Sequence, residues 1–123
     1  MAATARSVVT VERDVERAAV AAERLAGLDN VELLVGDWLN ELSSRAPFEL
    51  LFFDAGGLGE APEQVGPQAL DLLVRGGVLV KDDLTPGRNG PDPVRAFLLG
   101  HPGLVATELV TSSRMAVIVG ARR

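Results

Sequence analysis

Acidic residues recur along the chain, each placed at the end of a short, mainly apolar segment. They are Glu12, Asp37, Asp54 and the pair Asp82 and Asp83. If the apolar runs are strands of an open α/β sheet, these groups lie where such sheets bind ligands, beyond the carboxyl ends of the strands. Their convergence matters more than any one of them, because a single acidic residue in such a place often only caps the next helix.

The first two of these positions suit a nucleotide-like cofactor. A carboxylate at Glu12, between a strand and a helix, can accept two hydrogen bonds from a ribose diol. Gly36 lets a ligand approach the backbone closely, Asp37 can accept from an adenine amino group, and Trp38 can stack on a purine. Two structural alternatives stay open, namely that Glu12 only charges a helix N-terminus and that Trp38 is a core residue.

The later acidic positions suit a metal ion. Asp54, Asp82 and Asp83 offer three hard oxygen ligands of the kind that Mg²⁺ or Ca²⁺ takes. Three carboxylates brought together without a cation would repel one another. The alternative is an ion pair with Lys81, or capping of the turn formed by residues 84–87.

Several other chemistries are excluded by composition. The chain has no cysteine, which removes disulfide scaffolds, thiolate zinc sites and cysteine nucleophiles. A single histidine, His101, removes multi-histidine metal sites, and we expect it to be structural or exposed. Thr10, Ser112 and Ser113 lie in no G-x-S-x-G context, so acyl transfer has no support.

Length and charge indicate one soluble domain. The chain has 123 residues, of which 47% are hydrophobic and 24% charged. Its net charge of −5, without a basic cluster, argues against nucleic acid or an anionic membrane as a partner. Residues 1–6 lack the apolar run of a signal peptide, and no stretch approaches the roughly 20 apolar residues that cross a bilayer. We therefore expect a cytoplasmic protein.

The elements that must position these residues alternate regularly. Strands are predicted at residues 7–12, 31–35, 48–53, 78–80, 104–111 and 115–119, and helices at 15–26, 38–44, 64–74 and 94–99, the third helix with a possible interruption near Gly66 and Pro67. Alternation of this kind predicts the α/β class, with a Rossmann-like, mostly parallel sheet covered by helices on both faces. The last two strands form an antiparallel hairpin at one edge.

Four segments, in order, resemble successive motifs of a known family. VVTVERD, VELLVGDW, FELLFFDAG and LVRGGVLVKDDLTPG are similar to those of class I S-adenosylmethionine-dependent methyltransferases, and among them to metal-dependent O-methyltransferases like catechol O-methyltransferase. The resemblance runs from Ser7 to the last residue. It implies S-adenosylmethionine as cofactor and possible assistance by Mg²⁺. The implied site residues are Glu12 for the ribose, Gly36, Asp37 and Trp38 around the adenine, Asp82 and Asp83 for the cation, and Asp54 in both the cofactor and the metal set.

The chain departs from the family in two places. The family begins with a strand and an E-x-G-x-G-x-G-like loop, whereas this sequence starts just before what would be the second strand and contains no G-x-G-x-x-G. We therefore expect the first strand-helix unit to be missing and a gap between the strands that end at Glu12 and Asp54. Those strands pair directly, or a partner chain fills the space, or the true start lies upstream. The lysine expected three residues after Asp54 is Gly57, and the only lysine is Lys81.

The function that follows from the resemblance is transfer of a methyl group to a hydroxyl of a small molecule, with a cation lowering the pKa of that hydroxyl. One alternative is a non-catalytic remnant that serves as a dimerisation or partner-binding module, because unpaired strand edges invite association. We expect a homodimer. A nucleotide-binding α/β domain of another class is a third reading, against which the lack of a P-loop counts.

Overall fold

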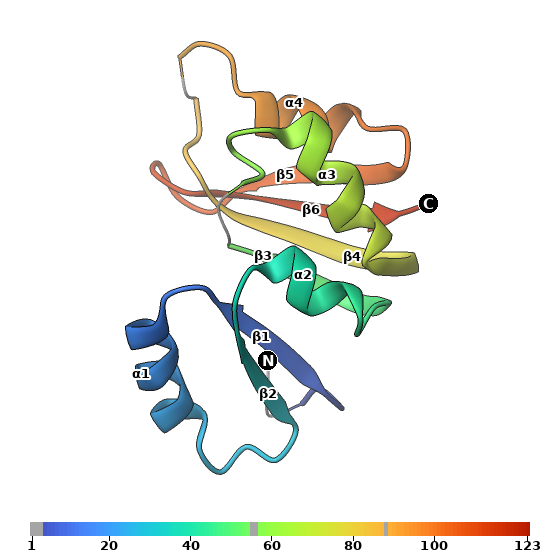
Figure 1. The fold of residues 1–123 in the computed structure, drawn as a ribbon. Coiled ribbons are helices and arrows are strands. Elements are labelled where there is room, and N and C mark those ends of the chain that lie inside the picture. The colour runs from blue at the N-terminus through green and yellow to red at the C-terminus, as the bar shows by residue number, and fades with distance from the viewer. Residues whose placement is uncertain (1–3, 55–56, 88) are drawn as a thin grey trace. The chain divides into compact units, whose positions relative to one another are not determined.

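The computed structural model describes residues 4–54, 57–87 and 89–123. Its elements follow the predicted order, β-α-β-α-β-α-β-α-β-β, and the predicted α/β class is confirmed (Figure 1). The contacts divide the chain into two compact units, Met1–Arg45 and Ala46–Arg123. The single domain expected from the length of the chain stays a prediction.

The first unit is a small β-α-β-α arrangement. It contains β1 (Val8–Glu12), α1 (Val15–Leu25), β2 (Val31–Val35) and α2 (Trp38–Ser43). The strands are parallel, in register from Val8 opposite Val31 to Glu12 opposite Val35. Asp14 caps α1 as predicted, because its side chain accepts from the amides of Glu16 and Arg17 at 2.9 and 3.0 Å. Because the two strands are parallel, their carboxyl ends lie at the same edge of the sheet.

The second unit contains the larger sheet. Its elements are β3 (Phe48–Phe53), α3 (Pro62–Asp71), β4 (Leu73–Leu84), α4 (Pro93–Gly100), β5 (Leu104–Val110) and β6 (Ala116–Arg122). The strand order is β3-β4-β6-β5. β3 and β4 are parallel, and β6 is antiparallel to both of its neighbours, which confirms the antiparallel C-terminal strands. Among the described strands, β1 pairs with β2, and β3 pairs with β4.

The core of the second unit lies between its sheet and two helices. α3 contacts β4 and α4, while α4 contacts β5 and β6, so both helices cover the same face of the sheet (Figure 1). The buried side chains include Leu51, Phe53, Leu79, Leu104 and Ile118 from the sheet and Ala69, Leu70, Val94, Phe97 and Leu98 from the helices. Burial of these aliphatic and aromatic groups is the main source of stability for this unit.

α3 differs from its prediction. It begins at Pro62, two residues earlier than expected, and runs through Gly66 and Pro67 without a break. Pro67 lies inside this helix, and because it has no N–H it cannot donate to the carbonyl oxygen of Glu63. Gly66 has a separate reason to be glycine, since a Cβ there would lie 2.2 Å from the ring of Phe97.

β4 is much longer than the predicted 78–80, and its register with each neighbour shifts once. The register with β3 shifts between Phe48, which lies opposite Leu73, and Leu50, which lies opposite Val78. Near its carboxyl end, Lys81 lies opposite Ile118 and Leu84 opposite Ala116, so β4 has one residue more than β6. This β-bulge holds Asp82 and Asp83, and Asp83 is left-handed, with φ 59°. Hydrophobic periodicity cannot reveal such insertions, because they depend on the neighbouring strand.

No helix among the described residues is long and apolar enough to cross a membrane.

Candidate functional site

Four of the predicted cofactor residues gather at one edge of the first unit. Glu12 ends β1 opposite Val35, and the amide of Gly36 donates to the Glu12 carbonyl oxygen at 3.1 Å. Asp37 and Trp38 follow directly, as the cap and first residue of α2. The topology therefore brings these residues together, as the acidic strand ends predicted. Their roles stay predictions.

At this edge, each of the two carboxylates uses one oxygen to accept hydrogen bonds from backbone amides. Oε1 of Glu12 accepts from the Asp14 amide at 2.8 Å. Oδ1 of Asp37 accepts from the amides of Leu39 and Asn40 at 3.1 and 3.4 Å. Glu12 therefore places its charge near the start of α1, as its structural alternative supposed. Asp37 caps the start of α2. In each case the second oxygen has no hydrogen bond to a described residue and stays available to a ligand.

Gly36 and Trp38 complete this edge. A side chain at position 36 would meet that of Glu41, with its Cβ 2.7 Å from Oε1 of that glutamate. Trp38 is half-buried, so it is neither a core residue of the unit nor a fully exposed platform.

A second acidic edge lies in the other unit, at the carboxyl ends of β3 and β4. Phe53 is in register with Lys81, so Asp54 and Asp82 follow at the ends of adjacent strands. The Asp82 side chain turns back to its own backbone, where Oδ1 accepts from the Asp83 amide at 2.8 Å. The Lys81 ammonium donates to the Asp82 carbonyl oxygen, also at 2.8 Å.

This second edge does not fit a metal ion. Over residues 4–54, 57–87 and 89–123, no group of three or more Asp, Glu, His or Cys side chains is placed to hold one. At this edge Asp83 has a left-handed backbone, with φ 59°, and the Asp82 carboxylate accepts from the Asp83 amide. The expectation of a Mg²⁺ site at Asp54, Asp82 and Asp83 is therefore not supported, and we derive no step through a cation.

The alternative that Lys81 forms an ion pair is not observed either. The ion pairs among the described residues join Arg45 to Glu32, Arg95 to Asp92 and Glu108, and Arg122 to Asp71.

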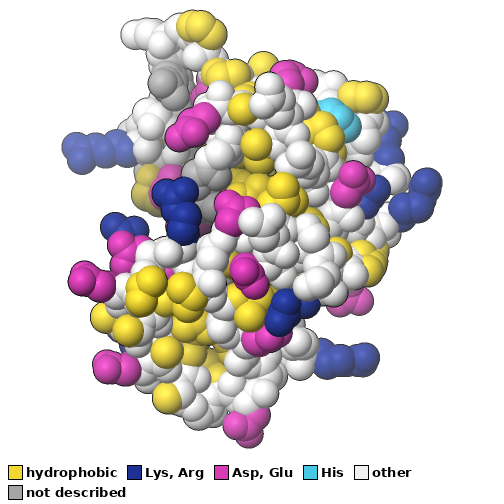
Figure 2. All heavy atoms as spheres, in the orientation of Figure 1, with side chains coloured by type: hydrophobic (Ala, Val, Ile, Leu, Met, Phe, Trp, Pro, Cys, Tyr) yellow, Lys and Arg dark blue, Asp and Glu magenta, His cyan; other side chains and the backbone are white. Residues whose placement is uncertain are grey.

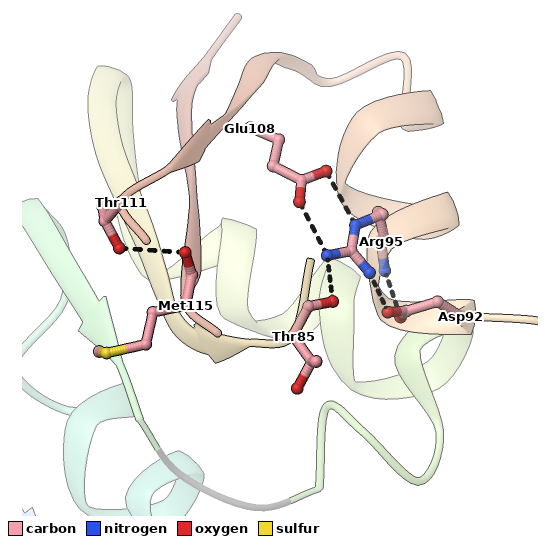
Figure 3. Close-up of polar contacts among 6 residues, drawn as sticks. All are labelled: Thr85, Asp92, Arg95, Glu108, Thr111 and Met115. Atoms are coloured by element: carbon pink, nitrogen blue, oxygen red, sulfur yellow. Dashed lines mark hydrogen bonds and ion pairs between the residues drawn. The ribbon is translucent and has the colours of Figure 1, made fainter. Parts of the chain in front are cut away.

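Sequence reasoning missed the most connected polar group of the second unit, which is Arg95 (Figure 3). Its guanidinium donates to both carboxylate oxygens of Glu108 at 2.9 and 2.8 Å, to the Thr85 carbonyl oxygen at 3.2 Å, and to Asp92. These bonds lower the pKa of the Glu108 carboxyl and raise that of Arg95. Arg95 thereby ties both ends of the β4–α4 connection to β5.

A shallow hollow of about 460 Å³ adjoins this cluster; it is lined by Gly87, Gly90, Asp92, Arg95, Ala96, Leu99 and Glu108. The spacing of Asp92 and Arg95 on one helix start was a sequence signal for their pair. Nothing local indicated Glu108, which is 13 residues from Arg95.

His101 has the structural role that was one of the two expectations. Its Nδ1 accepts from the Gly103 amide at 3.0 Å, and its ring lies 4.8 Å from that of Phe97. On the face shown in Figure 2, Lys and Arg side chains are dispersed among Asp and Glu side chains rather than gathered into a basic patch.

Comparison with solved structures identifies the fold. Cofactor-bound Rv0187 from MTB matches with a TM-score of 0.74 and 28% identity, over 95% of this chain and 62% of that one. The O-methyltransferase TomG from Streptomyces achromogenes, in complex with SAM, matches with a TM-score of 0.73 and 27% identity, over 94% and 61%. An O-methyltransferase from Bacillus cereus in complex with SAH, at 23% identity and a TM-score of 0.72, over 94% and 63%, shares the fold.

No family model and no curated protein matches the chain. The chain spans between 61% and 63% of the length of the three solved structures just named. The resemblance to class I S-adenosylmethionine-dependent O-methyltransferases, made from sequence motifs, is confirmed at the level of the fold.

Proposed function

We propose that this chain binds S-adenosylmethionine and forms part of an enzyme that methylates a hydroxyl group of a small molecule. The observation that supports it is the match to two cofactor-bound structures, at 27% and 28% identity, over nearly the whole chain. The chain spans only part of the length of these two structures. Cofactor binding is therefore proposed for this chain, and methyl transfer for the complete protein. No observation favours the alternative of a non-catalytic module, and a homodimer remains a prediction.

The first unit offers the groups for the cofactor. Glu12 keeps one carboxylate oxygen for a ribose hydroxyl, and Asp37 keeps one for the adenine amino group. Gly36 and Trp38 lie between and beside them on the same edge. Asp54, in the second unit, is the fifth cofactor residue predicted from the sequence.

In the proposed reaction the protein mainly orients its ligands. When bound, S-adenosylmethionine supplies an electrophilic methyl group on a sulfonium. The carboxylates of Glu12 and Asp37 fix the nucleoside, so that the acceptor oxygen can be held in line with the methyl carbon. Holding two reactants in this way removes much of the entropic barrier of a bimolecular reaction. No protein nucleophile is needed.

Calorimetric titration with S-adenosylhomocysteine tests cofactor binding by this chain. We expect one site per chain, and Glu12→Gln should weaken it about tenfold or more, because a hydrogen bond to a charged carboxylate is lost. Glu16→Gln is the matched control, since Glu16 is exposed on α1 of the same unit. Absence of heat from a chain shown by circular dichroism to be folded, or equal weakening by both substitutions, would contradict the proposal.

A further inference from the structure

β5 forms one edge of the sheet of the second unit, because the strand order is β3-β4-β6-β5. It pairs with β6 along its whole length, Leu104–Val110, without a shift of register. In an antiparallel pair, every second residue directs its backbone N–H and C=O groups toward the neighbouring strand, and the residues between direct theirs away. The Thr111 amide donates to the Met115 carbonyl oxygen at 3.0 Å, so Ala106 and Glu108 direct their backbone groups away from β6.

This edge lacks most of the features by which natural sheets prevent pairing with another chain. Those features include short length, lysine, proline, bulges and unpaired charges on the edge strand. β5 has seven residues, LVATELV, with no lysine or proline, and its pairing with β6 contains no bulge. Its one charged residue, Glu108, is bound through both carboxylate oxygens by Arg95 of the same chain (Figure 3). A strand added to β5 therefore meets a charge that is already offset.

Exposed apolar side chains gather along the same edge. Most of the exposed large hydrophobic residues in the described part of the second unit lie on β5 or on the segments beside it, namely Leu99, Val105, Leu109, Val110 and Met115. The three on the strand itself are 60%, 50% and 64% exposed. Contiguous apolar surface of this kind marks sites of protein association.

The residues of β5 are complementary to a second copy of the same strand. An antiparallel pair with its two-fold axis at Thr107, the middle residue of β5, gives the two copies their greatest overlap. Val105 of one copy then lies opposite Leu109 of the other, which makes an apolar pair. Ala106 lies opposite Glu108, and these are residues whose outward backbone groups can bond to each other.

The two adjacent registers are less favourable. An axis at Glu108 would place two carboxylates directly opposite each other, which destabilises a strand pair. An axis at Ala106 would require the outward backbone groups of Leu104. The Leu104 amide already donates to the His101 carbonyl oxygen at 3.0 Å, and its own carbonyl oxygen accepts from Nε of Arg123 at 3.3 Å. The side chains and hydrogen bonds of the strand thus favour the axis at Thr107.

We propose that two copies of this chain associate through β5, as an antiparallel pair centred on Thr107, so that their four-stranded sheets continue into one another. Both copies use the same strand, and a contact of this kind closes into a dimer and does not grow into a filament. All of the pairing residues belong to the second unit, and the association is independent of the proposed methyl transfer. The homodimer expected from the sequence thereby has a defined surface.

Cysteine cross-linking tests the register, because the chain contains no cysteine and an introduced thiol reports on one position. Residues at the axis form a pair without backbone hydrogen bonds, with Cα atoms about 4.5 Å apart, which a disulfide can bridge. Thr107→Cys should therefore form a covalent dimer on mild oxidation about tenfold or more faster than Leu109→Cys, whose two copies lie about 13 Å apart in this register. Equal or slower cross-linking of Thr107→Cys would overturn the proposal.

Sedimentation velocity of the 123-residue chain, up to millimolar concentration, measures the association itself. Wild type should form dimers, and Val105→Lys should raise their dissociation constant about tenfold or more, because lysine opposes pairing of an edge strand and each dimer would carry two. Val15→Lys, at an exposed valine of α1, is the matched control, and Leu50→Lys, on β3, reports on association through the face of the sheet. Both should dimerise like wild type.

Circular dichroism shows which variants are folded. A wild type that stays monomeric, equal dissociation constants for folded Val105→Lys and Val15→Lys, or a larger effect of Leu50→Lys than of Val105→Lys would each overturn the pairing through β5. If Val105→Lys does not fold, the cross-linking of Thr107→Cys decides, because that substitution changes one exposed side chain for another of similar size.

Discussion

Asp83 has an unusual backbone for a residue with a side chain. Its φ of 59° lies in the left-handed region, which only glycine enters freely, although aspartate tolerates it better than most residues. The bulge of β4 requires this conformation, because the extra residue must be accommodated between Lys81 and Leu84. Strain of this kind often accompanies sites that bind ligands, and here it lies two residues from Lys81.

Removing this strain should stabilise the protein. We expect Asp83→Gly to raise the free energy of unfolding by roughly 0.5–1 kcal/mol, and Asp83→Val, whose branched side chain disfavours the left-handed region, to lower it by about 1–2 kcal/mol. Urea unfolding measures both. Asp82→Gly is the control, because that residue has no positive φ and its carboxylate caps the Asp83 amide. A glycine at position 83 that destabilises as much as valine would contradict the prediction.

The ion pair of Glu108 with Arg95 should make stability depend on acid. Hydrogen bonds from Arg95 lower the pKa of Glu108 below the 4.5 of a free glutamate. The pair therefore contributes fully above that value, and the contribution is lost as the pH falls through the lower pKa of the folded state. Arg95 stays charged throughout this range.

Thermal unfolding at pH 7 and pH 3 measures this dependence. Glu108→Gln should lose less stability than wild type on acidification, by about 1 kcal/mol or less, since the pair is partly exposed. Glu23→Gln, on the exposed side of α1, should behave as wild type. Parallel acid profiles of wild type and Glu108→Gln would show that the pair does not contribute.

At the scale of elements, the contact between α3 and α4 depends on one missing side chain. The backbone of Gly66 lies against the ring of Phe97, and both residues are buried. An added methyl group has nowhere to go unless the helices separate or the ring turns. The contact joins two helices that are far apart in the sequence, so no local pattern around Gly66 predicts it. The sequence alone therefore predicts only a possible helix interruption at this glycine.

Gly66→Ala should therefore destabilise the protein by about 1–3 kcal/mol, although alanine is the better helix former. Gly100→Ala, at the end of α4 with open space around its Cβ, is the matched control and should be neutral or stabilising. Denaturant midpoints compare the two. If Gly66→Ala raises the midpoint as Gly100→Ala does, the close approach of the helices is wrong.

Local sequence patterns predicted which helices and strands form. They did not predict where the pairing of the strands is interrupted. Asp14 as a cap, the apolar run 48–53 and the final strand pair carried enough information for the α/β order. The bulge at Asp82 and Asp83 and the contact of Arg95 with Glu108 arise only when distant segments meet. The clustering of Glu12 with Asp37 was predictable, because parallel strands end at one edge, whereas the predicted metal group of Asp54, Asp82 and Asp83 was not supported.

At the scale of the molecule, apolar burial is divided unequally between the two units. Among the residues that the structure describes, the buried hydrophobic ones of the first unit are Ala18 and Leu42, whereas those from Leu51 to Ile118 belong to the second. A two-stranded sheet with so small a core is not expected to be stable alone. The second unit has a four-stranded sheet and two helices over one face.

We therefore expect residues 46–123 to fold cooperatively by themselves and residues 1–45 to remain unfolded in isolation. Circular dichroism and amide proton dispersion of the two separate segments measure this. A cooperative thermal transition of segment 1–45, or its absence in segment 46–123, would contradict the division of the core.

The placement of β6 between β4 and β5 has a consequence for biosynthesis. In the described sheet β5 pairs with β6, which is synthesised after it and which also pairs with β4. The sheet therefore cannot form completely until residues 116–122 have been synthesised. Until then the nascent β4 has one hydrogen-bonding edge without its final neighbour, and a chaperone that shields exposed strands would have this interval in which to act.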